Sequence, residues 1–82
     1  MKISYDPIYN IAYICFHNKP TEVETIKVSD ELNVDLLPDG TIYGIELLNA
    51  NEQLKDLKEC NLVIINEATG KKLEVPISHI IL

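Results

Sequence analysis

The segment Leu32–Leu48 constrains the fold of this chain more than any other part of it. Two runs of alternating apolar and polar residues flank Pro38–Gly40. A short segment of proline, aspartate and glycine between two such runs is a strong local signal for a β-hairpin. We therefore predict strands at about residues 32–37 and 41–47.

Two registers are compatible with this hairpin. In the first, Pro38 begins a type I turn in a three-residue loop and Gly40 takes a left-handed conformation as a bulge. That register places five residues on one face: Leu32, Val34, Leu36, Ile42 and Gly44. In the second, Leu36 pairs with Tyr43, which gathers four apolar residues: Leu32, Val34, Ile45 and Leu47. Turn chemistry favours the first and hydrophobic patterning favours the second; we favour the bulged turn.

Gly44 lies inside the second of these strands, where glycine costs stability unless the backbone bends or another group packs closely on it. We expect a bulge at Gly44 or an aromatic ring lying over it. Contact with a ligand is the alternative explanation.

The N-terminal third of the chain predicts three strands. Residues 2–5 alternate, Asp6 and Pro7 form a turn, and residues 11–16 are apolar at every position. An unbroken apolar run of this length indicates a strand buried on both faces, and we expect it to pair with the first strand near the middle of a sheet. A weaker pattern at residues 23–28 predicts the third strand.

The second half of the chain predicts one helix and two strands. Asn49 is a suitable N-cap, with Glu52 as its capping-box partner, for a helix over residues 49–60 that covers one face of the sheet. Residues 62–65 predict another buried strand and residues 71–75 a strand ending at Pro76. The chain ends in three apolar residues, which we expect to dock on its own core or on a partner: Ile80, Ile81 and Leu82.

Length and charge limit the possible functions. The chain has 82 residues, which we interpret as a single domain over residues 1–82 with a modest core, and a net charge of −6. All seven basic residues are lysines. Because arginine is the usual reader of phosphate and guanine, we expect no direct binding to nucleic acid. An acidic domain suits a basic protein partner better.

The N-terminal sequence has no apolar core of a signal peptide, and no apolar run is long enough for a membrane span. Cys15 and Cys60 are too far apart for a CxxC motif, so we expect reduced thiols and a cytoplasmic protein.

Residues whose side chains could bind a metal or take part in catalysis are present but scattered along the sequence. Cys15 and His17, with Cys60 and His79 more distant, lack the paired short spacing of zinc sites, so we interpret Cys15 as a packing residue. Carboxylates surround the predicted hairpin: Asp6, Asp35, Asp39 and Glu46. We assign Asp6 and Asp39 to turns and predict no catalytic residue, cofactor or metal. The alternative is a small-ligand binder or enzyme that uses Asp35, Glu46 and the tyrosines around Gly44.

Three strings of residues resemble a family of small prokaryotic proteins, the domain-of-unknown-function family numbered 2283, over residues 2 to about 54. They are Tyr5-Asp6-Pro7 followed by Ala12-Tyr13-Ile14; Val23-Glu24-Thr25; and Asp39-Gly40-x-x-x-Gly44-Ile45-Glu46-Leu47-Leu48 followed by Ala50. The chain departs from the family at Ile8–Asn10, which is usually more acidic, and at Asn49, where aspartate is usual. Both departures remove carboxylates, which counts against a metal or acid–base role.

The resemblance implies a mainly antiparallel β-domain with a helix and no established activity. Some members look like antitoxins encoded beside small basic toxins. Together these features predict an α+β fold and a non-enzymatic protein-interaction module, antitoxin-like, whose partner is a small basic protein. The competing interpretation is a self-associating structural domain. The candidate interaction residues are Asp35, Tyr43, Gly44, Glu46, Ile80, Ile81 and Leu82.

Overall fold

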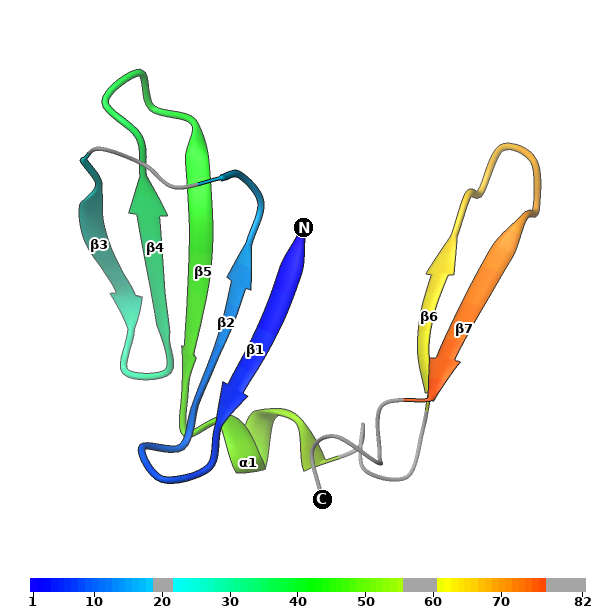
Figure 1. The fold of residues 1–82 in the computed structure, drawn as a ribbon, viewed down its shortest axis with the longest axis horizontal. Helices are drawn as coiled ribbons and strands as arrows, with labels where there is room; N and C mark the ends of the chain where they lie inside the picture. Colours follow the sequence, from blue (N-terminus) through cyan, green and yellow to red (C-terminus); the bar gives the residue numbers. More distant parts are fainter. Residues whose placement is uncertain (19–21, 56–60, 77–82) are drawn as a thin grey trace.

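A computed structural model describes residues 1–18, 22–55 and 61–76 of the chain. It contains a mainly antiparallel sheet, a separate hairpin and one short helix (Figure 1), which confirms the predicted fold class. The elements in chain order are β1 (Lys2–Asp6), β2 (Ile11–Cys15), β3 (Glu24–Ser29), β4 (Leu32–Leu36), β5 (Ile42–Leu48), α1 (Ala50–Gln53), β6 (Asn61–Ile65) and β7 (Lys72–Pro76).

The main sheet has five strands in the order β1-β2-β5-β4-β3, and all of its neighbouring strands are antiparallel. The predicted hairpin of the first two strands is present, and β2 lies second from one edge. β5, the second strand of the Leu32–Leu48 hairpin, is the centre of the sheet. This segment therefore supplies the middle strand on which both halves of the sheet assemble.

The structure satisfies both the turn chemistry and the hydrophobic pattern of the β4–β5 hairpin. Leu37 N–H donates to the Thr41 carbonyl at 2.8 Å and Gly40 N–H donates to the Leu37 carbonyl at 2.9 Å, which closes the three-residue loop. Gly40 has a φ of 88°, in the left-handed region that glycine favours. This is the bulged turn that we favoured.

The face assignment derived from that turn was wrong, because the hairpin contains a second irregularity. Leu36 pairs with Ile42 and Asp35 pairs with Gly44, so Tyr43 is an extra residue on β5. An extra residue reverses the alternation of side chains beyond it. Val34 consequently pairs with Ile45, and the apolar residues gather as in the second register.

The two faces of the sheet follow from its register, because paired residues in antiparallel strands project to the same side. One face carries a polar row across four strands: Tyr13, Glu46, Asn33 and Lys27. The other face carries an apolar row across all five strands, which we call the apolar row: Ile3, Ile14, Ile45, Val34 and Ile26. The sheet is thus clearly two-sided.

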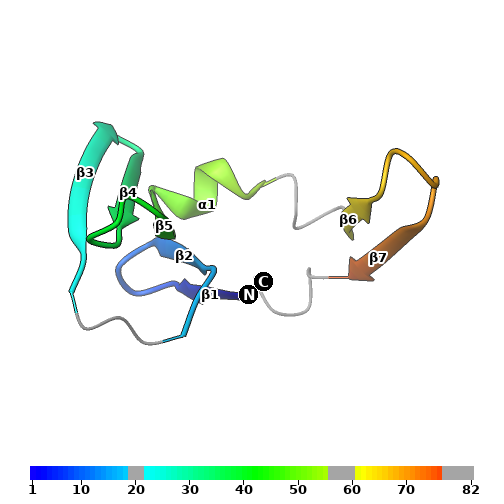
Figure 2. The ribbon, with the colours of Figure 1, turned by 90° about the horizontal axis from the view of Figure 1, so that it is seen from above.

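The core is small. Only Ala12 on β2 and Ala50 on α1 are buried hydrophobic residues among the described residues, and α1 packs against β2. Figure 2 shows α1 on one side of the sheet, at the end where β5 finishes. We predicted that residues 11–16 are buried on both faces. That prediction was wrong, since the other residues of β2 are only half-buried and Phe16 is exposed.

The helix differs from its prediction. α1 comprises Ala50–Gln53, and residues 56–60 of the predicted helix lie outside the described residues. Asn49 occupies the N-cap position with a left-handed φ of 53° and makes no side-chain capping bond, so the predicted capping box is absent. Asn10 replaces it from the β1–β2 turn: its carbonyl accepts from Ala50 N–H at 3.0 Å and its Oδ1 accepts from Asn51 N–H at 2.7 Å.

β6 and β7 form a two-stranded antiparallel hairpin of their own and stand apart from the sheet in both views (Figures 1 and 2). We predicted that residues 62–65 form a buried strand. The structure corrects this, because Val63, Ile64 and Ile65 are exposed. No helix in the described part of the chain is long and apolar enough to cross a membrane.

Candidate functional site

A cluster of polar side chains lies on the face of the sheet opposite the apolar row, with Asp35 at its centre. The Tyr13 hydroxyl donates to Asp35 Oδ2 at 2.6 Å, and the Thr25 hydroxyl donates to Asp35 Oδ1 at 2.5 Å. These three residues come from β2, β4 and β3. Both oxygens of the Asp35 carboxylate therefore accept a hydrogen bond from a neighbouring side chain.

Gly44 makes this cluster possible. β5 lies between β2 and β4 in the sheet, so the Tyr13 ring must cross it to reach Asp35. A Cβ built on Gly44 would overlap the Tyr13 hydroxyl and lie only 2.6 Å from its Cζ. We expected either a bulge or an overlying aromatic ring at Gly44, and the structure has both: the extra residue Tyr43 beside it and the Tyr13 ring on top of it.

The environment holds the proton on Tyr13. Burial, followed by the hydrogen bond to Asp35 and the negative charge of Asp35, raises the pKa of the Tyr13 hydroxyl well above its usual value of 10.0. At neutral pH, Tyr13 is therefore a neutral donor to a carboxylate. Such a pair connects β2 to β4 and orders this face of the sheet.

Tyr43 and Cys15 extend the cluster toward the end of β2. The rings of Tyr13 and Tyr43 lie 6.4 Å apart at an angle of 45°, a tilted aromatic pair. The neighbouring Cys15 side chain, followed by burial, raises the pKa of the Tyr43 hydroxyl above its usual value. Tyr43 is the extra residue of the bulge, next to Gly44 on β5.

Glu46 lies one row away from Asp35 on the same face. Asn33 Nδ2 donates to Glu46 Oε1 at 3.0 Å across the β4–β5 pair. Glu46 also pairs in register with Tyr13 on its other side. The structure therefore brings four of the sequence candidates onto one face: Asp35, Tyr43, Gly44 and Glu46. The cross-strand hydrogen bond from Asn33 gives a structural reason for the carboxylate of Glu46 among apolar neighbours in the sequence.

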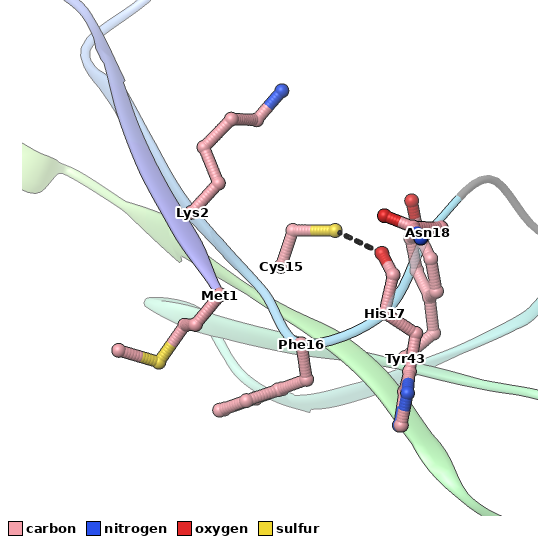
Figure 3. Close-up of a pocket in the computed structure, with 7 residues that line it drawn as sticks. All are labelled: Met1, Lys2, Cys15, Phe16, His17, Asn18 and Tyr43. Carbon is pink, nitrogen blue, oxygen red and sulfur yellow. Dashed lines mark hydrogen bonds between the residues drawn. The ribbon is translucent and has the colours of Figure 1, made fainter.

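A pocket of about 310 Å³ opens beside this cluster, where β1 begins and β2 ends (Figure 3). Its lining residues are Met1, Lys2, Cys15, Phe16, His17, Asn18 and Tyr43. Of the sequence candidates for ligand contact, Tyr43 lines this pocket, whereas Asp35 and Glu46 do not. Figure 3 shows the Cys15 thiol directed at the His17 backbone carbonyl, to which it donates at 3.0 Å.

The Cys15 thiol is thus bonded to the backbone of His17. Within residues 1–18, 22–55 and 61–76, no three histidine, cysteine or acidic side chains are grouped to hold a metal ion. Cys60 and His79, the more distant members of that set, lie outside the described residues, as do Ile80, Ile81 and Leu82.

The residues that we assigned to turns from the sequence lie in turns of the structure. Asp6 Oδ1 accepts from Ile8 N–H at 2.9 Å and from Tyr9 N–H at 3.3 Å, in the turn that contains Pro7. Asp39 Oδ1 accepts from Thr41 N–H at 2.9 Å in the loop with Pro38 and Gly40, and this bonding at Thr41 lowers the pKa of Asp39.

Tyr13 and Thr25 lie in the strings that resemble the family, but the sequence did not identify either residue as a partner of Asp35. Gly44 itself indicated that an aromatic ring packs on β5, but four tyrosines were available for that role. The pairing of β2 with β5 selects Tyr13, and this pairing joins segments about thirty residues apart. Thr25 is chosen in the same way by the pairing of β3 with β4.

Comparison with known protein families gives a match over the five-stranded sheet. Residues 2–51 match the family described as "Protein of unknown function (DUF2283)". Those residues include the whole five-stranded sheet and the start of α1. Neither the curated proteins nor the solved structures contain a match to the chain.

Proposed function

Because this chain belongs to the DUF2283 family of proteins of unknown function, we propose its role from its structure. We propose that it is a cytoplasmic, non-enzymatic protein-interaction module. Its partner is a small basic protein that binds along β3, as an antitoxin would bind a basic toxin. The observation that carries the proposal is the exposed, acidic edge at β3.

β3 is an edge strand of the five-stranded sheet, and all six of its residues are exposed. An edge strand presents backbone N–H and C=O groups to which an extended segment of another protein can add as a further strand. Ile26 and Val28 are large hydrophobic residues exposed on this strand. The edge thus offers both backbone hydrogen bonds and apolar contact area.

The charges around β3 support a basic partner. Four exposed carboxylates lie on the strand or beside its ends: Glu22, Glu24, Asp30 and Glu31. Lys27 is the single lysine between them, and it forms an exposed ion pair with Asp30 at 3.2 Å. Carboxylates at the rim of a contact steer a positively charged partner and contribute more to its association rate than to its final affinity.

The test is co-expression of the full chain with the product of its neighbouring gene, followed by purification through a tag on the chain. We expect a stoichiometric complex with a small basic protein. Its association rate should fall at least about 10-fold between low and physiological salt, because exposed charges are screened over about 8 Å at 0.15 M ionic strength.

Charge reversal locates the contact. Glu24→Lys and Asp30→Lys should each slow association several-fold, since each places a positive charge where the partner is positive. Glu67→Lys is the matched control, because Glu67 is an exposed carboxylate in the turn between β6 and β7. The proposal fails if no basic partner is recovered, or if Glu67→Lys weakens binding as much as the β3 variants do.

A further inference from the structure

The apolar row is only partly covered: its three central residues, Ile14, Ile45 and Val34, are half-buried and its two ends are exposed. It crosses all five strands with β-branched residues, and the residues at its two ends, Ile3 and Ile26, are 50% and 42% exposed. α1 packs on the neighbouring row, where Ala12 is buried. Antiparallel sheets of this kind normally bury one face on another layer of structure. Among the described residues, the layer that covers this face of the sheet is therefore incomplete.

The β6–β7 hairpin has an apolar face of its own. Leu62 pairs with Val75 and Ile64 pairs with Leu73, so these four side chains share one side. The opposite side alternates apolar with charged residues, since Val63 pairs with Glu74 and Ile65 with Lys72. Ile64 and Leu73 are 49% and 59% exposed. In the described part of the chain, no sheet is packed on this apolar face of the hairpin.

A two-stranded hairpin is at best marginally stable alone in water, and it needs a hydrophobic surface to pack against. In this structure the hairpin stands away from the sheet of its own chain (Figures 1 and 2). The described residues thus present two apolar surfaces, the apolar row and the Leu62–Val75 side of the hairpin, which lie apart from each other in this structure.

We propose that two copies of this chain form a dimer in which each β6–β7 hairpin packs on the apolar row of the other copy. The exchange is reciprocal, so it closes with two-fold symmetry and leaves neither surface exposed. It uses the apolar face rather than the backbone groups of the β3 edge, with Ile26 as a residue common to both surfaces, and it therefore goes beyond the basic-partner function proposed above.

The dimensions fit. Each hairpin strand has five residues, which gives a length of about 17 Å at about 3.4 Å per residue. The apolar row spans five strands, or about 19 Å at about 4.8 Å per interval. A hairpin laid across the strands covers the row from Ile3 to Ile26, and near-perpendicular packing of two sheets is one of the two common arrangements.

The first measurement is the mass of the full chain by light scattering over a range of concentrations. We expect twice the 9.3 kDa of one chain. A mass of one chain at every concentration overturns the proposal, because the hairpin then covers its own sheet or neither surface is covered.

Matched variants identify the surfaces in contact. Leu73→Glu and Ile3→Glu should each return the mass to one chain, since each puts a carboxylate in the proposed interface. Ile65→Glu and Ser4→Glu should remain dimeric, because these residues lie on the opposite sides of the hairpin and of β1. Ile65 is a close match for Leu73, at 55% against 59% exposed. A dimer that survives Leu73→Glu, or dissociates with Ile65→Glu, overturns the exchange.

A measurement on the unmodified chain keeps the test independent of variant folding. In a sample mixed from isotope-labelled and unlabelled chains, nuclear Overhauser contacts between chains should join the Leu73 methyls to those of Ile14 and Ile45. Contacts between chains that link the apolar row only to itself would instead indicate face-to-face sheets and reject the exchange. Both measurements report self-association alone, whereas co-purification reports the basic partner, so failure of the dimer is distinguishable from failure to bind a basic partner.

Discussion

The Tyr13 hydroxyl donates a 2.6 Å hydrogen bond to Asp35 across the central strand β5, over the position where Gly44 has no side chain. One glycine thereby allows a contact between two strands that are not neighbours. The arrangement ties β4 and the edge strand β3, through Thr25, to the β1–β2 half of the sheet. Several expectations about stability depend on it.

Replacing Gly44 with alanine should destabilise the protein by about 1–3 kcal/mol, the usual cost of overpacking. Gly44 is not among the residues with positive φ, so its backbone accepts alanine and the cost is steric. The free energy of unfolding in urea measures the effect. In a Tyr13→Ala background the same substitution should cost much less, because the ring that it displaces is gone; an equal cost in both backgrounds would contradict this explanation.

Tyr13→Phe keeps the ring over Gly44 and removes only the hydroxyl. We expect the free energy of unfolding to fall by about 1.5–3 kcal/mol, the range for a hydrogen bond to a charged group. Asp35 then keeps Thr25 as its remaining donor in the cluster. Tyr9→Phe, at an exposed tyrosine in the β1–β2 turn, is the control and should change stability little. Urea unfolding at pH 7 compares the two variants.

The raised pKa of Tyr13 makes this contribution dependent on pH. The folded protein holds the proton to a higher pH than the unfolded chain, whose tyrosines titrate near 10.0. Below that value the contribution of Tyr13 is fully present; above it the unfolded chain loses the proton first, and stability falls. The difference in unfolding free energy between wild type and Tyr13→Phe should therefore shrink from pH 9 to pH 11. A constant or growing difference would show that Tyr13 ionises at least as readily in the folded protein as in the unfolded chain.

Gly40→Ala should destabilise the β4–β5 hairpin by about 1 kcal/mol, because its φ of 88° is unfavourable for a residue with a Cβ. A Cβ at this position meets no other atom within 4 Å, so the cost is conformational and not steric. Gly40→Asn should cost less, since asparagine tolerates the left-handed region better. Thermal melts of the two variants measure this difference. Equal losses of stability in both variants would argue against a conformational cause.

Asn10 caps α1 from a distant turn, so Asn10→Ala should cost about 1–2 kcal/mol, as the loss of an N-cap does. Its side chain also donates to Asn51 Oδ1 at 2.7 Å, and its φ of 58° is itself unfavourable for alanine. Asn10→Gly, which relieves the backbone but lacks the side chain, separates the two contributions. Hydrogen exchange at the Asn51 amide should accelerate in both variants; unchanged exchange there would exclude Asn10 as the cap.

The sequence by itself determined the local structure of this protein. Pro38, Asp39 and Gly40 specify their turn, Asp6 and Pro7 specify another, and alternating apolar residues specify the strands, because each of these signals acts over a few neighbouring residues. Gly44, a glycine inside a strand, also indicated that the backbone bends there or that an aromatic ring packs on it. The family to which the chain belongs was recognisable from the same short strings.

Only the tertiary structure decided which residues meet. The extra residue Tyr43 reverses the alternation along β5. Gly44 indicated a bulge as one of two explanations, but the effect of the bulge on the two faces depends on how β5 fits β2 and β4 at the same time. That fit selects Tyr13 to cover Gly44 and brings Asn10 to the start of α1. Within the described residues, it also leaves the two ends of the apolar row and most of β6 exposed, because an apolar pattern indicates that a face is to be buried but does not identify the surface that buries it.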